Sequence, residues 1–278
     1  MPAVLETAEP KSSVGREGGL TLPVMDLGLS GKVALVTGVS YGIGAAAADA
    51  FIREGAQVFG TSRSAPTPRD GLAHLSVDMG EPDAGDKAVA ACLKEFGHLD
   101  VLVNNVGSGR IGTGFTAESD DIWQQFWELN FMSAVRTTRA ALQALTRNGG
   151  VVVNVSSVNG RLPESGIYAY SASKAAMNNL TVNLAREYAG QQVRVVGVAP
   201  GPVDTPLWLG PTGVAAQASA LGAGDADSII ASARKEVPIG RFSSAEEVAD
   251  LIVFLASTRA GSLTGTIVTI DGGITPTA

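Results

Sequence analysis

One expected helix places a proton donor beside a positive charge. Tyr170 and Lys174 lie four positions apart in the segment 168–189, whose pattern predicts a helix. Side chains at positions i and i+4 share one helix face, so the phenol and the ammonium are neighbours. A free Tyr has a pKa of about 10, and a nearby cation favours the phenolate and lowers that pKa. The pair therefore predicts proton exchange with an alcohol or a ketone, whereas Tyr168, with no Lys four residues later, makes no such prediction.

Such a pair is common on helices, so its interpretation depends on what lies nearby in the fold. Ser156 and Ser157 close an expected strand that begins at Val151. The carboxyl ends of strands in an open α/β sheet face the ligand crevice. We therefore expect Ser157 to hydrogen-bond the same substrate oxygen that Tyr170 protonates.

A glycine-rich turn, TGVSYGIG, follows the first expected strand and leads into an Ala-rich helix. Gly38 permits a tight turn, Gly42 lets the backbone approach a pyrophosphate, and Gly44 lets the helix pack close to the sheet. The free N–H groups at the start of the helix then face the phosphates. The turn predicts a dinucleotide site.

The second expected strand ends without an acidic residue, which would otherwise accept hydrogen bonds from the adenosine ribose. Ser62 leaves room at this position, and Arg63 is able to pair with a 2′-phosphate. This pattern favours NADP(H), although it does not exclude NAD(H), and an ordinary solvated Arg63 is the alternative interpretation.

Alternating strands and helices must position these residues. The strand runs are short, continuous and rich in Val and Ile, which is typical of strands covered on both faces. We expect strands at 33–37, 57–61, 74–77, 101–104, 151–156, 193–199 and 266–270, and helices at about 43–54, 83–96, 119–147, 168–189 and 245–256. The predicted fold class is α/β, a doubly wound (Rossmann), mostly parallel seven-stranded sheet with helices on both faces.

The alternation of strands and helices is interrupted in two segments. Residues 205–240 are rich in Gly and Pro and weakly patterned, so we expect a lid over the substrate, with a mobile surface loop as the alternative. Residues 1–27 mix Pro, Gly, Ser and charges without a period, and we interpret them as a mobile tail. A single domain is then expected over residues 28–278.

Composition excludes several classes of protein. The net charge of −7 and the lack of a Lys/Arg cluster argue against a nucleic-acid surface, and no apolar run is long enough to span a membrane. The single cysteine, Cys92, lies in an apolar helical pattern, so we expect a small buried side chain in a reducing, cytoplasmic setting. The two histidines lack metal-ligand spacing, and no metal site is expected.

Together these residues resemble the short-chain dehydrogenase/reductase (SDR) superfamily, in its compact single-domain branch. The resemblance covers about residues 28–274, and the carboxy-terminal pattern is similar to 3-oxoacyl-carrier-protein reductases. The matching positions are Thr37-Gly38-x3-Gly42-x-Gly44, Asp78, Asn104-Asn105-Val106-Gly107, Asn130, Ser157, Tyr170-x3-Lys174, Pro200–Thr205, Pro238–Phe242, Glu246–Ala249 and Asp271–Gly273.

The resemblance implies a role for each catalytic position. Tyr170 would be the general acid in reduction, and Lys174 would hold the nicotinamide ribose and lower the Tyr170 pKa. Ser157 would orient the carbonyl and stabilise developing negative charge. Asn130 would hold a water that links Lys174 to solvent.

The resemblance also implies a cofactor site. Asp78 and the Met79 backbone would contact the adenine, Asn104 and Gly107 would flank the adenosine, and Val203 with Thr205 would hold the carboxamide. Tyr41 stands where many NADP-preferring relatives carry Arg or Lys, so the preference depends mainly on Arg63. The full expected set is Gly38, Ser40, Tyr41, Gly42, Ile43, Gly44, Ser62, Arg63, Asp78, Met79, Asn104, Gly107, Tyr170, Lys174, Pro200, Gly201, Val203 and Thr205.

The expected function is an NADP(H)-dependent carbonyl or 3-oxoacyl-type reductase acting on a small ketone or secondary alcohol. Expected substrate contacts are Ser108, Asn159, Trp208 and Leu209. Trp208 and Leu209 are interpreted as closing over the ligand, with anchorage of the lid to its own core as an equal alternative.

Three alternatives stay open. They are an NAD-dependent dehydrogenase that oxidises a sterol, sugar or polyol; a non-catalytic dinucleotide sensor; and a dimerisation scaffold. We also expect a homotetramer or dimer through helices 119–147 and 168–189, while Arg136, Arg139 and Arg147 could meet an acidic carrier protein.

Overall fold

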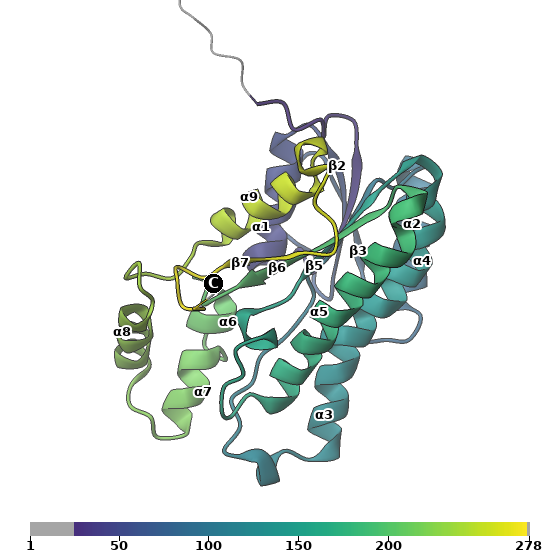
Figure 1. The fold of residues 1–278 in the computed structure, drawn as a ribbon. Coiled ribbons are helices and arrows are strands. Elements are labelled where there is room, and N and C mark those ends of the chain that lie inside the picture. Colours follow the sequence, from purple (N-terminus) through teal and green to yellow (C-terminus); the bar gives the residue numbers. More distant parts are fainter. Residues whose placement is uncertain (1–24, 277–278) are drawn as a thin grey trace, which may run out of the picture.

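The computed structural model describes residues 25–276 and shows a parallel sheet between two layers of helices (Figure 1). The sheet has seven strands in the order β3-β2-β1-β4-β5-β6-β7, all paired in parallel. The strands are β1 (Val33–Thr37), β2 (Gln57–Ser62), β3 (Leu72–Ser76), β4 (Val101–Asn104), β5 (Val151–Val155), β6 (Arg194–Pro200) and β7 (Ile267–Ile270). The predicted fold class is confirmed.

Helices cover both faces of the sheet. The pair α1 (Gly42–Arg53) and α9 (Ala245–Ala256) packs on one face, and α2 (Ala84–Phe96), α4 (Ser133–Asn148) and α5 (Tyr168–Tyr188) lie on the other (Figure 1). Each face buries its own apolar cluster, so side chains of both parities along β1, β4 and β5 are inside. This double burial explains why the strand runs are continuously apolar rather than alternating.

Cys92 belongs to the cluster on the α2 and α4 side. Its side chain is fully buried, and burial raises the pKa of the thiol to about 12. A thiol in such surroundings behaves as a small apolar side chain, as predicted from its neighbours.

The long helix expected over 119–147 is interrupted in the structure. It consists of α3 (Asp120–Trp127), a π turn at Glu128–Met132, and α4. Such a turn adds a residue to the helical repeat and redirects the side chains that follow it. The apolar spacing alone does not reveal the added residue, because both halves are amphipathic.

The segment expected as a weakly patterned lid is mostly helical. It contains α6 (Pro206–Leu209), α7 (Val214–Ala220) and α8 (Ala226–Glu236). The α7 sequence is rich in Ala, and the Asp225 side chain caps α8 by accepting a hydrogen bond from the Ser228 N–H. Glycines separate these short helices, which is why the sequence of this segment predicted no regular helix.

The predicted tail lies almost entirely outside the described residues. Two residues at its end do contact the domain: the Leu27 carbonyl accepts from the Thr258 N–H at 3.1 Å, and the Asp26 carbonyl accepts from Arg259 at 2.7 Å. Asp26 and Leu27 thus contact the turn after α9, and the domain boundary expected at residue 28 stays a prediction. Within residues 25–276, no helix is long and apolar enough to cross a membrane.

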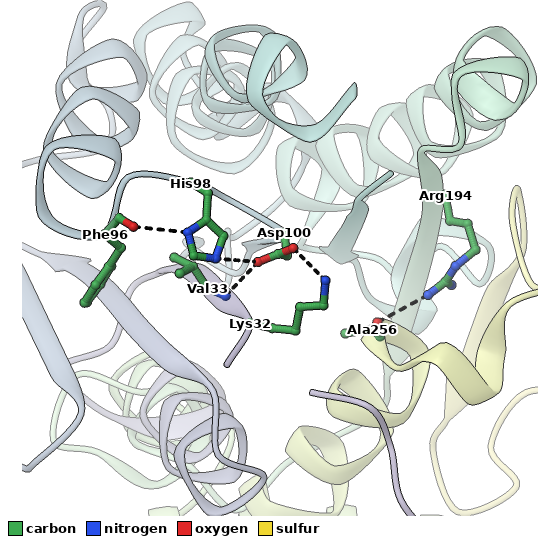
Figure 2. A network of polar contacts seen from close by, with 7 residues as sticks. All are labelled: Lys32, Val33, Phe96, His98, Asp100, Arg194 and Ala256. Atoms are coloured by element: carbon green, nitrogen blue, oxygen red, sulfur yellow. Dashed lines mark hydrogen bonds and ion pairs between the residues drawn. The ribbon is translucent and has the colours of Figure 1, made fainter. Parts of the chain in front are cut away.

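The edge of the sheet where the strands begin has a polar network (Figure 2). Asp100, just before β4, is buried and accepts from the Val33 N–H at 2.9 Å, from Lys32 at 2.9 Å and from His98 at 3.2 Å. The carboxylate therefore joins the starts of β1 and β4 at the centre of the sheet.

Nearby, Arg194 at the start of β6 reaches the end of α9. Its guanidinium donates to the carbonyls of Leu255, Ala256, Ser257 and Leu263 at 2.9–3.3 Å. These contacts satisfy carbonyl groups that a helix end leaves without partners. Arg194 thus ties α9 and its following turn to the sheet.

We predict that Asp100→Asn lowers the free energy of unfolding by about 1–3 kcal/mol, because one of the donors around the buried carboxylate then faces an amide N–H₂. Urea unfolding at one protein concentration measures it. Asp250→Asn is the matched control, since the Arg53–Asp250 pair is 58% and 66% exposed, and it should cost less than about 0.5 kcal/mol. Equal losses in the two variants would contradict the assigned role of Asp100.

Candidate active site

The strand order reverses between β1 and β4, and a cleft of about 1290 Å³ opens at the carboxyl ends of the strands. Reversal points of this kind are the usual ligand sites of doubly wound sheets. The cleft extends from the end of β2, across the glycine turn, to α5 and the lid helices. Its lining therefore joins segments that are far apart in the sequence.

Most of the expected site residues line this cleft. They are Gly38, Ser40, Tyr41, Gly42, Ile43, Ser62, Arg63, Asp78, Met79, Gly107, Ser108, Ser157, Asn159, Tyr170, Lys174, Pro200, Gly201, Val203, Thr205 and Trp208. Four expected residues do not line it: Gly44, Asn104, Asn130 and Leu209. Each of the four has a separate physical reason.

The glycine turn has the backbone that its spacing predicts. Gly38 has φ +80° and Gly42 has φ +61°, values that strain most other residues. A Cβ added to Gly44 would lie 2.1 Å from the Gly38 carbonyl oxygen, so Gly44 serves the packing of α1 rather than the cleft surface. No side chain caps the start of α1, which leaves its N–H groups directed at the cleft.

Thr37 and Asn105 hold the glycine turn against the loop after β4. The Thr37 hydroxyl accepts from the N–H groups of Asn105 and Val106 at 2.9 and 3.2 Å. The Asn105 amide donates to the carbonyls of Thr37 and Gly38 at 2.9 and 3.2 Å. Sequence analysis did not assign Asn105 a role, although its place in the motif was a signal.

Asn104 is turned into the protein interior instead of flanking the cleft. Its amide donates to Thr138 on α4 and to Asn154 on β5, each at 2.9 Å, and Asn154 donates to Thr181 on α5 at 2.9 Å. The side chain of the last residue of β4 points away from the crevice, whereas Asn105 and Val106 line the cleft.

Tyr170 and Lys174 lie in the first turns of α5 and face the cleft. The Lys174 Nζ atom donates to the Val155 carbonyl at 2.9 Å and lies 5.8 Å from the centre of the Tyr170 ring. Burial lowers the pKa of Lys174 to about 8. The ammonium is thus held by the end of β5 rather than free in solvent.

The pKa of Tyr170 differs from the sequence-based expectation. Burial raises it above its ordinary value, and the nearby Ser157 hydroxyl acts in the opposite, lowering direction. Desolvation of the phenolate has the largest effect on this pKa, and the lowering expected from Lys174 is absent in the free site. Tyr170 is therefore a protonated phenol at neutral pH.

Ser157 comes directly after β5 and begins a short 3₁₀ turn at Val158–Gly160. Its hydroxyl donates to the Asn159 side-chain oxygen at 3.3 Å and accepts from the Asn159 N–H at 3.2 Å. Asn159 thus orients Ser157 in addition to lining the cleft. Its own amide donates to the Leu162 carbonyl at 3.2 Å, which holds the turn in place.

Asn130 lies in the π turn, fully buried behind the cleft wall. Its side chain accepts from the Ser108 N–H at 2.8 Å and donates to the Ser108 carbonyl at 3.1 Å. A Cβ added to Gly107 would lie 3.2 Å from the Asn130 Oδ1 atom and 3.4 Å from the Lys174 Nζ atom. Gly107 therefore keeps a narrow gap between these two side chains.

The lid residues divide between two roles. Trp208 lines the cleft, but it also packs on Phe242 with ring centres 5.0 Å apart, and Arg234 of α8 pairs with Asp204 at 2.9 Å. Leu209 is 41% exposed and does not line the cleft, although it was expected there. Pro206, Leu207 and Trp208 of the short helix α6 line the cleft instead.

A smaller cavity of about 530 Å³ adjoins the cleft between the lid and α3. The two cavities share Ser108, Gly109, Arg110, Pro211 and Thr212. Within residues 25–276, no group of three His, Cys, Asp or Glu side chains is placed to bind a metal ion.

Comparison with known proteins identifies the class of protein. A family model described as short chain dehydrogenase matches residues 32–210. The chain is 37% identical over 267 residues to an uncharacterized oxidoreductase, YvrD, of Bacillus subtilis, which covers 90% of this chain and 98% of that protein. It is 32% identical over 256 residues to the 3-oxoacyl-(acyl-carrier-protein) reductase FabG of Vibrio cholerae, covering 89% and 99%.

A solved structure agrees with the sequence comparisons. The L-sorbose reductase of Gluconobacter frateurii, complexed with NADPH and L-sorbose, has a TM-score of 0.84 and 34% identity, and the match covers 91% of this chain and 100% of that chain. The chain belongs to the short-chain dehydrogenase/reductase family. It is an oxidoreductase that acts on CH–OH and C=O groups.

We predict that Gly44→Ala lowers the free energy of unfolding by about 1–3 kcal/mol, because the new methyl group overlaps the Gly38 carbonyl and displaces α1. Chemical denaturation measures the loss. Gly190→Ala is the control, since nothing lies within 4 Å of the added Cβ, and its stability should change by less than about 0.5 kcal/mol. A Gly44→Ala protein as stable as the parent would refute the close contact.

Proposed function

We propose that this oxidoreductase is an NADP(H)-dependent reductase of ketones, with Tyr170 as the general acid. The observation that carries the proposal is that Ser157, Tyr170 and Lys174 line the same cleft as the glycine turn. A raised pKa keeps the Tyr170 phenol protonated, which is the form that donates to a developing alkoxide. Reduction is therefore the direction that the free site favours.

The substrate carbonyl would be held between two hydroxyl groups. Ser157 and Tyr170 are both in the cleft wall, at the end of β5 and the start of α5. Hydrogen bonds from both hydroxyls to one carbonyl oxygen stabilise the negative charge that forms there during reduction. Tyr170 then transfers its proton to that oxygen, while Ser157 keeps its own.

Lys174 and Asn130 would resupply the Tyr170 proton. With a pKa of about 8, Lys174 is mostly an ammonium at neutral pH, yet it is close enough to neutrality to exchange a proton. The gap beside Gly107 separates Lys174 from the Asn130 oxygen. We propose that a water in this gap links Lys174 to solvent.

The residues present fit a nicotinamide dinucleotide. The start of α1 offers N–H groups to a pyrophosphate, and Gly42 lets the backbone approach it. Asp78 and Met79 line the cleft and would contact the adenine, and Val203 and Thr205 also line it and would hold the carboxamide. The bound cofactor supplies the hydride, and the chain's residues hold and orient both reactants.

Arg63 supports a preference for NADP(H) over NAD(H). It lines the cleft directly after β2, and among the described residues its guanidinium has no hydrogen bond or ion pair. An uncommitted guanidinium at this position suits a 2′-phosphate, which accepts two parallel hydrogen bonds from it. The similar L-sorbose reductase is complexed with NADPH.

A second candidate function is an NAD-dependent dehydrogenase that oxidises a sugar, polyol or sterol, and the similarity to a sorbose reductase favours a sugar or polyol. Oxidation requires the Tyr170 phenolate, which burial disfavours. A non-catalytic sensor is the weaker alternative, because binding alone does not need Ser157, Tyr170 and Lys174 together in the cleft wall.

The partners of the chain follow from its surface. We propose a homotetramer or dimer through α3, α4 and α5, supported by the exposed side chains of Phe115, just before α3, and Trp127, at its end. A carrier protein has less support, because Arg136 already pairs with Glu128 and donates to the Gly80 carbonyl. A cytoplasmic location also stays a proposal.

We predict that Tyr170→Phe lowers kcat for ketone reduction by roughly 10²–10⁴-fold, because the proton donor is lost. Equilibrium binding of NADPH should change little, since the ring and its packing remain. Tyr168→Phe is the control: this ring packs on Phe115 at 5.6 Å and lies outside the cleft lining, so kcat should stay near that of the parent. Full activity in the Tyr170→Phe enzyme would overturn the mechanism.

We predict that Arg63→Ala weakens NADPH binding by roughly 10–100-fold, the equivalent of one charge-assisted contact, and leaves NADH binding within about threefold. Nucleotide fluorescence titration of the free protein measures both. Arg53→Ala, which removes an exposed guanidinium on the far side of α1, is the control. Tighter binding of NADH than of NADPH by the parent would remove the role assigned to Arg63.

A further inference from the structure

The Ser62 hydroxyl at the adenosine end of the cleft has two close polar neighbours. Ser62 is the last residue of β2, is 5% exposed and lines the cleft. Its Oγ atom lies 2.6 Å from the Ser64 carbonyl oxygen and 2.8 Å from the Nε2 atom of His74. His74 belongs to β3, the strand that pairs with β2 at this edge of the sheet.

The position of the single Ser62 proton follows from these two contacts. A carbonyl oxygen accepts hydrogen bonds and never donates them, so the 2.6 Å contact uses the Ser62 proton. The His74 Nε2 atom must then be the donor to Ser62 Oγ. A neutral imidazole with its proton on Nε2 meets this requirement, and burial lowers the pKa of His74, which favours the neutral form.

Ser62 therefore presents an acceptor to the cleft and no proton. One oxygen lone pair receives the His74 N–H, and the other remains for a ligand. A 2′-phosphate has only acceptor oxygens at neutral pH or carries at most one proton, whereas a ribose 2′-hydroxyl is able to donate. In doubly wound folds an acceptor at the end of the second strand is what binds that hydroxyl.

Resting on the proposed dinucleotide site, we propose that His74 is a positioning residue that holds Ser62 as an acceptor for the adenosine 2′-hydroxyl. The 2′ position is then recognised by two neighbouring residues with opposite chemistry. Arg63 binds the phosphate of NADP(H), and Ser62, held by His74, binds the hydroxyl of NAD(H). The chain accordingly binds both dinucleotides, with a preference set by the balance of these two contacts.

Calorimetric binding of NAD⁺ and NADP⁺ to the free protein tests this without turnover. Ser62→Ala should weaken NAD⁺ binding by roughly 2–10-fold, the equivalent of one neutral hydrogen bond, and leave NADP⁺ binding unchanged or tighter. If Ser62 instead donates to the phosphate, Ser62→Ala weakens NADP⁺ binding more than NAD⁺ binding. That result, or an equal effect on both ligands, overturns the proposal.

Two substitutions of His74 test its part. His74→Gln keeps an N–H donor near the place of Nε2. The Kd of NAD⁺ divided by the Kd of NADP⁺ should therefore stay within about twofold of the parent ratio. His74→Leu releases the Ser62 hydroxyl to turn toward a phosphate, and this ratio should rise by roughly 2–10-fold. An unchanged or lower ratio in His74→Leu contradicts the assigned role, and an altered ratio in His74→Gln does so too.

The same titrations separate this inference from the function on which it rests. A parent protein that binds neither dinucleotide refutes the proposed function. A parent that binds both, with a Ser62→Ala response opposite to the expected one, refutes only the role of Ser62 and His74. Because Ser62→Ala removes a single oxygen, it also serves if His74→Leu fails to fold.

Discussion

The reversal of strand order between β1 and β4 is the constraint from which the site follows. Two neighbouring parallel strands there send their chains in opposite directions over the sheet, and the separation opens the cleft. Thr37 and Asn105 bind the two diverging segments to each other through side-chain contacts with backbone groups. Without these contacts, the position of the glycine turn relative to the cleft wall that carries Gly107 would not be fixed.

The side chains proposed as catalytic depend on this arrangement indirectly. Lys174 is buried, and its ammonium has the Val155 carbonyl as partner because β5 ends beside the start of α5. Asn130 reaches the loop after β4 and binds both backbone polar groups of Ser108. Buried polar groups are costly without partners, so these hydrogen bonds hold Lys174 and Asn130 in place in the free protein.

The sequence predicts the architecture well where the signal is local. Continuous Val-rich runs locate the strands, and three glycines locate the turn at the start of α1, because burial on both faces and positive φ angles each restrict residue type. The spacing of Tyr170 and Lys174 gives their common face. Their pKa values could not be read from that spacing, since these depend on burial by segments distant in the sequence.

Other parts of the site escape prediction for physical reasons. Asn104 and Asn105 are adjacent and identical in type, yet Asn104 points into the core and Asn105 points toward the glycine turn. The direction of each side chain depends on where β4 ends, which is after Asn104. Leu209 was expected at the cleft, but Leu207 lines it and Leu209 does not, because residues two positions apart on the single turn of α6 face different sides. His74 carries no motif, and its contact with Ser62 exists only through the pairing of β2 with β3.

The π turn at Glu128–Met132 has a consequence for how this chain tolerates change in length. Loss of one residue there would restore a regular helix and rotate Asn130 by about 100° relative to α4, away from Ser108. Insertions and deletions are usually harmless only in surface loops. Here the extra residue lies in the middle of a helix, in a turn that contains the buried side-chain amide of Asn130. Once an inserted residue has acquired such a contact, its removal is no longer neutral for the fold.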